Sequence, residues 1–116
     1  MLPIIGLLKH PLKRSPTLEQ RQKILDRMKR QNLLRGAWLY EADLQGMNLS
    51  HFDLEEADLF ESDLQMALLR NANLKDATLR QANLSQANLS EADLTGADLS
   101  EANLEGADLS GATLKD

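Results

Sequence analysis

The chain reads ANLSQANLSEADLTGADLS from residue 82 to residue 100, and this stretch decides the fold. Leucine stands at every fifth position, and the same spacing continues without interruption from Leu34 to Leu114. Alanine stands two positions before thirteen of the sixteen leucines from Leu39 onward, and Asp or Asn usually stands directly before the leucine. The residues that replace alanine are Met47, Phe52 and Ser62.

A period of five residues matches neither an α-helix nor a β-strand. On a helix of about 3.6 residues per turn, leucines five apart would spiral around the axis. On a strand they would alternate between the two faces, because five is an odd number. Only a chain that bends at every repeat keeps all the leucines inside. The pattern therefore predicts a solenoid whose core consists of leucine and alanine.

Sixteen successive units of the form A-[D/N]-L-x-x fill residues 37–116, and in this the chain resembles the pentapeptide-repeat family. The resemblance implies an all-β solenoid, a right-handed quadrilateral β-helix in which four pentapeptides form each coil. About four coils would follow, with leucine and alanine pointing inward and the other three residues pointing outward. The Ala-Asp-Leu-Ser and Ala-Asn-Leu-Ser units look like those abundant in cyanobacteria.

Charge divides the chain into two parts. Residues 1–35 carry nine Lys or Arg and two acids, a net charge of +7, whereas residues 36–116 carry sixteen acids and four bases, a net charge of −12. Their sum is the formal net charge of the chain, −5. We therefore predict a basic N-terminal arm with a capping helix (1–35) and an acidic pentapeptide-repeat solenoid (36–116). Opposite charges favour contact between the two parts.

A helix is predicted over residues 16–33 of the arm. Ser15, which precedes a proline, can cap its start, or Thr17 and Gln20 can form a capping box. The dipeptide Arg35-Gly36 is typical of a helix C-terminus. The apolar face of this helix contains Leu18, Ile24, Leu25 and Met28.

Three roles are open for this amphipathic helix. It can cap the first coil of the solenoid, dock on a partner protein, or lie on an acidic membrane surface. We favour the cap, because an uncovered first coil would expose leucine, alanine and unpaired strand edges. The bulky Met47 and Phe52 both fall in that first coil, where a covering helix could adjust to them.

The candidate partner surface consists of Trp38, Tyr40, Phe60 and Arg80. A spacing of twenty residues would stack the last three in one column, with Arg80 in a cation–π contact on Phe60. Such a ladder would support the helix or shield a coil edge, or it would form a patch that binds a partner. The candidate dimer end contains Leu109 and Leu114, and a two-fold axis there would produce a homodimer through the C-terminal coil.

The remaining patterns predict no enzyme and no catalytic, cofactor or metal site. The chain has no cysteine, its two histidines are far apart in sequence, and it lacks a phosphate-binding loop. The outward carboxylates are expected on a convex wall without a cleft, with Asp43 over Asp63 as the adjacent acidic pair. The apolar run at residues 1–8 is too short to span a membrane and lacks the features of a signal peptide. A cytoplasmic location is the default expectation.

We therefore predict a non-enzymatic protein-interaction module whose partner is an unidentified protein. Direct binding to nucleic acid and to membranes is not expected. One alternative is a DNA mimic that binds DNA gyrase, a type II topoisomerase, since family members that protect gyrase resemble duplex DNA in shape and charge. Another alternative is an adaptor that the helix tethers to an acidic membrane surface.

Overall fold

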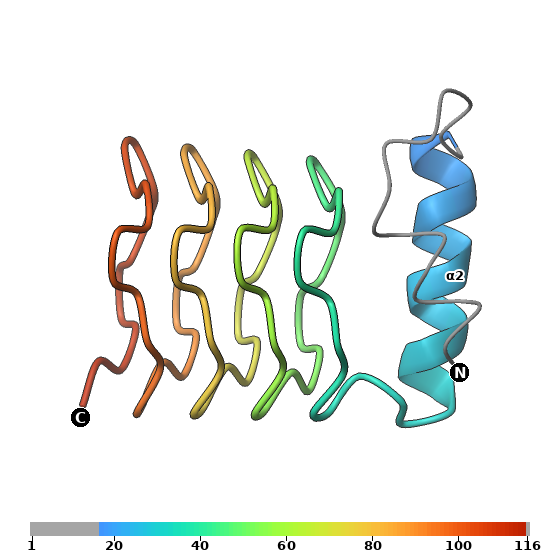
Figure 1. Ribbon diagram of the computed structural model, residues 1–116, viewed down its shortest axis with the longest axis horizontal. Coiled ribbons are helices and arrows are strands. Elements are labelled where there is room, and N and C mark those ends of the chain that lie inside the picture. Colours follow the sequence, from blue (N-terminus) through green and yellow to red (C-terminus); the bar gives the residue numbers. More distant parts are fainter. Residues whose placement is uncertain (1–16, 116) are drawn as a thin grey trace.

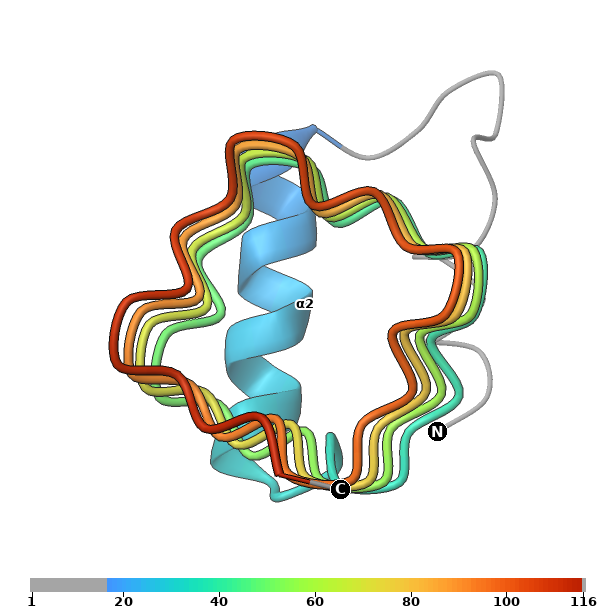
Figure 2. The same cartoon turned by 90° about the vertical axis from the view of Figure 1, so that its left-hand side faces the viewer.

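The computed structural model describes residues 17–115, which form one α-helix followed by a stack of solenoid turns, each of which is one full winding of the chain (Figure 1). Helix α2 (Leu18–Arg30) lies across one end of the stack, and the chain then winds away from it toward the C-terminus. Seen along the stack, successive turns superpose around a common interior (Figure 2). This arrangement is a solenoid, as the five-residue period predicts.

Parallel β-bridges hold the turns together, and each bridge joins residues that are twenty apart in sequence. Trp38 pairs with Asp58, for example, and Asp58 pairs with Thr78. The twelve bridges among the described residues fall into four columns, with one bridging residue on each side of a turn. Each bridging residue is the one directly before a leucine. The solenoid is therefore a β-helix whose strands contain only isolated bridges.

Within each solenoid turn, a four-residue β-turn at every repeat bends the chain. The N–H of the alanine-position residue donates to the carbonyl of the leucine three positions earlier, as from Ala87 to Leu84 at 3.0 Å. The residue two positions after each leucine has a positive φ, between +55° and +73° from Gly36 to Gly111. A positive φ at the third of four residues, without one at the second, is typical of a type II turn. Gly96 and four other glycines lie at this position, although most of these β-turns use Glu, Gln, Asn or another residue with a side chain.

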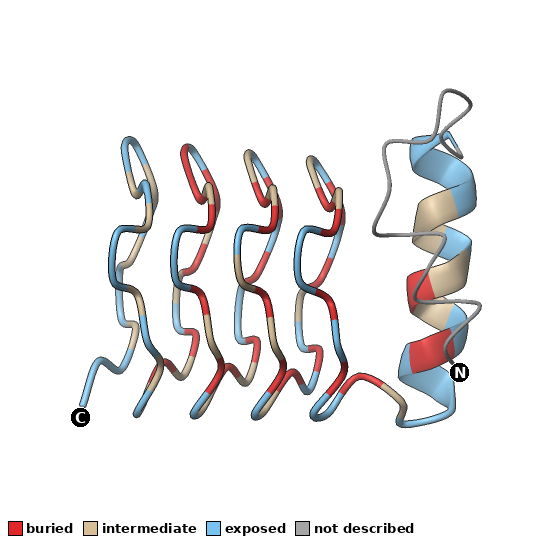
Figure 3. Ribbon diagram, in the orientation of Figure 1, coloured by how far each residue is buried: buried red, intermediate tan, exposed pale blue. Residues whose placement is uncertain are grey.

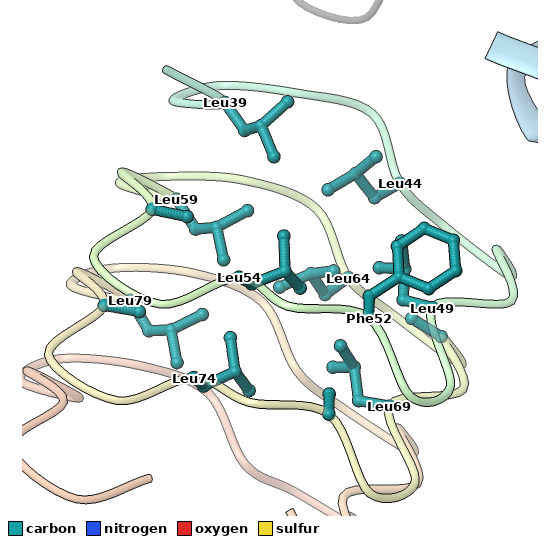
Figure 4. Close-up of a cluster of buried hydrophobic side chains, with 14 of the residues drawn as sticks. Leu39, Leu44, Leu49, Phe52, Leu54, Leu59, Leu64, Leu69, Leu74 and Leu79 are labelled. Carbon is teal, nitrogen blue, oxygen red and sulfur yellow. The ribbon is translucent and has the colours of Figure 1, made fainter. Parts of the chain in front are cut away.

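The side chains inside the turns form one continuous leucine and alanine core (Figure 4). Leu74 and Leu84 are fully buried, as are most of their counterparts up to Leu94. Met47 and Phe52 occupy alanine positions in the first turn and are also buried. Ser62 is buried as well, and its hydroxyl has no hydrogen-bond partner among the described residues.

Asp and Asn have a specific structural task at the position before leucine. Their side-chain oxygen accepts a hydrogen bond from the N–H two residues later, as between Asn83 and Ser85 at 3.0 Å. The same contact recurs in every described repeat that has Asp or Asn there; the N–H of Phe60, for example, donates to Asp58 at 3.1 Å. This Asx contact satisfies a backbone donor at the start of each of these β-turns.

Helix α2 begins with the predicted capping box at Thr17. The Thr17 hydroxyl accepts from the N–H of Gln20 at 3.2 Å, and the Gln20 amide oxygen accepts from the N–H of Thr17 at 2.8 Å. The alternative start at Ser15 lies outside the described residues. The helix ends at Arg30, because Asn32 adopts a φ of +55° and the N–H of Leu33 bonds to the carbonyl of Met28 at 2.9 Å.

The predicted helix stop at Arg35-Gly36 is therefore wrong. Gly36 instead enters the solenoid, where its N–H donates to the carbonyl of Glu55 at 2.8 Å. Its φ of +69° matches the positive-φ position of the other turns. Asn32, which tolerates a left-handed conformation, ends the helix in a Schellman-type arrangement.

Apolar side chains of α2 pack on the first turn of the solenoid. Leu25 and Met28 are fully buried in the common core, and Ile24 is half-buried against it. Lys29 places its Nζ 4.8 Å from the centre of the Phe52 ring, a cation–π contact. Leu18 departs from the predicted apolar face, since it lies in the first turn of α2 and is 49 % exposed.

Polar contacts from α2 fix its position on the solenoid edge. The Gln22 side-chain amide accepts from the N–H of Asn48 and donates to the carbonyl of Asn48, both at 2.8 Å. It also donates to Asp26 at 3.0 Å, which holds the amide in orientation. Arg21 lies 3.3 Å from Asp43 and offsets the repulsion between Asp43 and Asp63, which are bridged as the sequence predicts.

Candidate interaction surfaces

Three aromatic residues, Trp38, Tyr40 and Phe60, lie in the first two turns of the solenoid. Trp38 is 57 % exposed and Tyr40 is 37 % exposed, whereas Phe60 is half-buried. The N–H of Glu41 donates to the carbonyl of Phe60 at 2.7 Å, so Tyr40 and Phe60 occupy neighbouring positions in successive turns. These three residues form what we term the aromatic face.

Arg80 follows Phe60 in the same column, because the N–H of Glu61 donates to the Arg80 carbonyl at 3.0 Å. Within residues 17–115 no cation–π contact joins its guanidinium to Phe60, so the predicted contact is wrong. Arg80 instead pairs with Glu101 in the next turn at 3.5 Å. A carboxylate competes well with an aromatic ring for a guanidinium at an exposed site.

Carboxylates without a counter-ion surround the aromatic face. Asp58 lies directly beside Trp38 in the adjacent turn, and Glu41 and Glu61 follow in the same two turns. Within residues 17–115, none of these three acids forms an ion pair. The surface around the exposed rings therefore carries a net negative charge.

A second exposed apolar pair, Met66 and Leu68, was not predicted from the sequence. Met66 is 47 % exposed and adopts a φ of +59°, and Leu68 is 43 % exposed. Leu68 bridges Asn48 and Asn88, so it stands in a column that otherwise contains amides and an acid. An aliphatic residue at the pre-leucine position was the sequence signal that could have revealed this pair.

The outer side of α2 is basic and exposed. Lys23, Arg27 and Arg30 are exposed and, with Ile24 and Asp26, line a shallow crevice of ≈ 360 Å³. A similar crevice of ≈ 370 Å³ lies where α2 meets the first turn, and Lys29, Arg35 and His51 contribute to it. Since Leu25 and Met28 are buried in the solenoid, the main apolar contacts of the helix are already occupied.

The C-terminal turn exposes the core progressively (Figure 3). Leu99, Leu104 and Leu109 are half-buried, whereas Leu114 is 55 % exposed. The predicted dimer residues Leu109 and Leu114 thus lie on the same partly open end of the described stack. This end offers apolar surface together with backbone groups of the last turn.

Three aspartates near the C-terminus have a lowered pKa. The Ser100 hydroxyl and then the Ser100 N–H donate to Asp98, and these bonds stabilise its charged form and lower its pKa. The hydroxyl and N–H of Ser110 lower the pKa of Asp108 in the same way. Thr95 has the corresponding effect on the pKa of Asp93. All three carboxylates accept hydrogen bonds within the β-turns, so they have a structural role.

The described residues contain no grouping of three His, Cys, Asp or Glu side chains that could hold a metal ion. Within residues 17–115, no helix has the length and apolar composition that crossing a bilayer requires.

Comparison with known proteins identifies the repeat. The family model for pentapeptide repeats (8 copies) matches residues 37–76 and again residues 77–116. Among curated protein sequences, none matches the chain.

Several solved structures share this fold. A pentapeptide repeat protein from Nostoc PCC 7120 is 42 % identical, with a TM-score of 0.68, and the match covers 78 % of this chain and 72 % of that protein. A pentapeptide repeat protein from the Arabidopsis thaliana thylakoid lumen is 35 % identical, with a TM-score of 0.69, over 71 % of this chain and 57 % of that one. HetL, a pentapeptide repeat protein involved in heterocyst differentiation regulation in Nostoc sp. strain PCC 7120, is 40 % identical with a TM-score of 0.65. The HetL match covers 66 % of this chain but only 36 % of HetL, so this chain spans a minor part of that protein.

Proposed function

Because this chain belongs to the pentapeptide-repeat family, we propose that it is a non-enzymatic protein-interaction module whose partner surface is the aromatic face. Proteins of this family are generally non-enzymatic structural modules, and the similar structures from Nostoc are those of pentapeptide repeat proteins. The observation that carries the proposal is the concentration of exposed rings, Trp38 and Tyr40, on an otherwise polar wall. Exposed aromatic residues that cluster are enriched in protein interfaces.

In this proposal the solenoid is a right-handed quadrilateral β-helix of four coils, and α2 is its N-terminal cap. The twenty-residue spacing of the bridges supports the coil length. The burial of Leu25 and Met28 and the two bonds from Gln22 to Asn48 support the cap. A rigid cap on the first solenoid turn would keep the aromatic face in a fixed shape and lower the entropy cost of binding.

A pull-down from lysate of the source organism tests the interaction module. The bait is the full chain, compared with Trp38→Ala, which removes the most exposed ring of the aromatic face. The matched control is Met66→Ala, which removes a comparably exposed apolar side chain outside that face. We expect a partner that the Trp38 variant loses and the Met66 variant keeps. If both variants capture the same proteins as the parent chain, the aromatic face is not the partner surface.

We further propose a homodimer through the turn that contains Leu109 and Leu114. Support comes from the half-buried core leucines there and the 55 % exposure of Leu114. Light scattering across a dilution series should give a dimer mass at high concentration, and Leu114→Lys should shift it to a monomer mass. A monomer mass of the parent chain at all concentrations contradicts the dimer, and a dimer that survives Leu114→Lys contradicts this interface.

The two alternatives receive less support. A membrane tether needs the apolar face of α2, yet Leu25 and Met28 are buried in the solenoid core. A gyrase-binding DNA mimic needs an acidic surface, but α2 adds exposed Lys23, Arg27 and Arg30 at one end. Gyrase supercoiling and liposome-binding assays with the full chain are expected to show no effect.

A further inference from the structure

The N-terminal edge of the first turn has four bridging positions, and among the described residues its backbone is paired at Asn48 but open at Trp38, Asp43 and Asp53. At Asn48 the Gln22 amide supplies both the donor and the acceptor that a preceding turn would otherwise supply. At Trp38 neither the N–H nor the C=O has a hydrogen-bond partner among the described residues. Within the described part of the chain, the one bridge of Trp38 is to Asp58, on the side away from α2.

We term the part of this N-terminal edge at Trp38 the Trp38 edge. Its backbone has the geometry that accepts an added strand. In every later turn the residue at this position pairs with the turn before it: the N–H of Asp58, for example, donates to the carbonyl of Ala37, and its carbonyl accepts from the N–H of Leu39. The first turn has the same backbone geometry at Trp38, but no segment within residues 17–115 pairs with it there. An extended peptide that lies along the edge could therefore donate to the Trp38 carbonyl and accept from the Trp38 N–H.

The side chains around this edge define the chemistry of the peptide. Trp38 is 57 % exposed and offers apolar contact and a ring face for cations. The neighbouring Glu41, Asp58 and Glu61 have no ion-pair partner within residues 17–115. Lys or Arg side chains next to apolar ones would match both features.

We propose that the Trp38 edge is a strand-addition site for an extended basic peptide segment of a partner protein. The added strand pairs its backbone with Trp38, packs apolar side chains on the aromatic face, and places basic side chains near Asp58, Glu41 and Glu61. The inference rests on the proposed function, since it specifies the segment of the partner that the aromatic face binds.

Trp38 is the only tryptophan of the chain, so its fluorescence reports on this site. The probe is the capped peptide Lys-Val-Lys-Val-Lys-Val, titrated into the full-length protein. We expect a saturable change in emission. A peptide of the same sequence with every backbone nitrogen methylated should bind about tenfold more weakly, because it loses the donor to the Trp38 carbonyl. The peptide Glu-Val-Glu-Val-Glu-Val should give no change.

Asp58→Asn tests the charge requirement without removing the turn contact, since an Asn side chain can still accept from the N–H of Phe60. This variant should bind the basic peptide several-fold more weakly, and the loss should shrink at high salt. The matched control is Asp108→Asn, which neutralises an exposed acid at the far end of the stack and keeps the acceptor for Ser110. It should bind like the parent chain.

Several results would overturn the inference. Absence of a saturable emission change refutes it directly, and equal affinity for the methylated and unmethylated peptides refutes strand addition. Equal binding by the Asp58 and Asp108 variants refutes the charge requirement. A partner that depends on Trp38 in the pull-down would still support the proposed function in each case, so the two failures are distinguishable. Displacement of the peptide by a second copy of the chain, seen as weaker binding at higher protein concentration, would also contradict a separate partner as the occupant.

Discussion

Substitution of Gln22 by alanine tests whether a side-chain amide completes the solenoid edge. The change removes the hydrogen bonds to the N–H and the C=O of Asn48, both 2.8 Å long, and leaves the apolar contacts of Leu25 and Met28 in place. A net contribution of about 0.5–1.5 kcal/mol per bond, at the lower end because Asn48 is exposed, gives a loss of roughly 1–2 kcal/mol. The melting temperature should fall by roughly 5–10 °C.

Gln22→Glu sharpens the test. The carboxylate can still accept from the Asn48 N–H, but it faces the Asn48 carbonyl and lies near Asp26 with no proton to donate. At neutral pH this variant should be less stable than Gln22→Ala, although it keeps more atoms.

Denaturant unfolding followed by far-ultraviolet circular dichroism gives the free energies, and hydrogen exchange at the Asn48 amide gives the local effect. The matched control is Gln31→Ala, which truncates an exposed glutamine just after the helix. If Gln22→Ala unfolds like Gln31→Ala, and the Asn48 amide keeps its protection, then the amide does not replace a strand.

Three further predictions concern the core and the turns. Leu84→Ala should lower the free energy of unfolding by about 2–5 kcal/mol, because Leu84 is fully buried and the change leaves a cavity; an unchanged midpoint in denaturant would show that the leucine does not point inward. Ser62→Ala should raise the free energy of unfolding by about 1 kcal/mol, since it removes a buried hydroxyl without a partner and restores the usual alanine; a less stable variant would mean that this hydroxyl is satisfied. Because hydrogen bonds from Ser100 lower the pKa of Asp98 in the folded state, the stability that they confer is present above the unfolded pKa of about 3.9 and is lost as the pH falls through the folded pKa. Ser100→Ala should raise the pKa of Asp98 toward its ordinary value in an NMR titration, and an unchanged titration would exclude the hydroxyl as the cause.

The sequence predicted those features that depend on spacing alone. The five-residue period was sufficient for the solenoid, and the twenty-residue register correctly placed Asp43 beside Asp63. The capping box at Thr17 was also predicted, since it needs only two side chains three positions apart. These features follow from local geometry that any similar chain would share.

Features that depend on competition between contacts were not predictable. Arg80 pairs with Glu101 rather than Phe60, because a salt bridge across one turn competes with the ring. Non-glycine residues such as Met66 adopt positive φ because backbone bonds between turns, including 2.9 Å from Met66 to Ser85, impose the turn on them. The exposure of Leu18 depends on the angle at which α2 crosses the first solenoid turn, and the sequence of the helix does not determine that angle.

The candidate functional surface could be predicted only in part from the sequence. Trp38 and Tyr40 stood out as aromatic residues in a chain that has few, and they are exposed in the structure. The open backbone groups of Trp38 could not be predicted, because they depend on where α2 supplies hydrogen bonds and where it does not. Gln22 marks the position that α2 supplies, yet nothing in the sequence distinguishes it from other glutamines.

The twenty-residue bridge register has a consequence for how such chains can change in length. Inserting one pentapeptide would preserve the leucine core, because every unit presents the same inward pair. All later residues would nevertheless move to the next side of the stack, so contacts such as Gln45 to Gln65 or Arg35 to Glu55 would be lost if the insertion fell between them. Only gain or loss of twenty residues conserves both core and surface. Duplication of a whole solenoid turn is therefore the change that this architecture tolerates best. Duplication of a single repeat would displace the outward residues relative to one another and so disrupt any binding surface that they form.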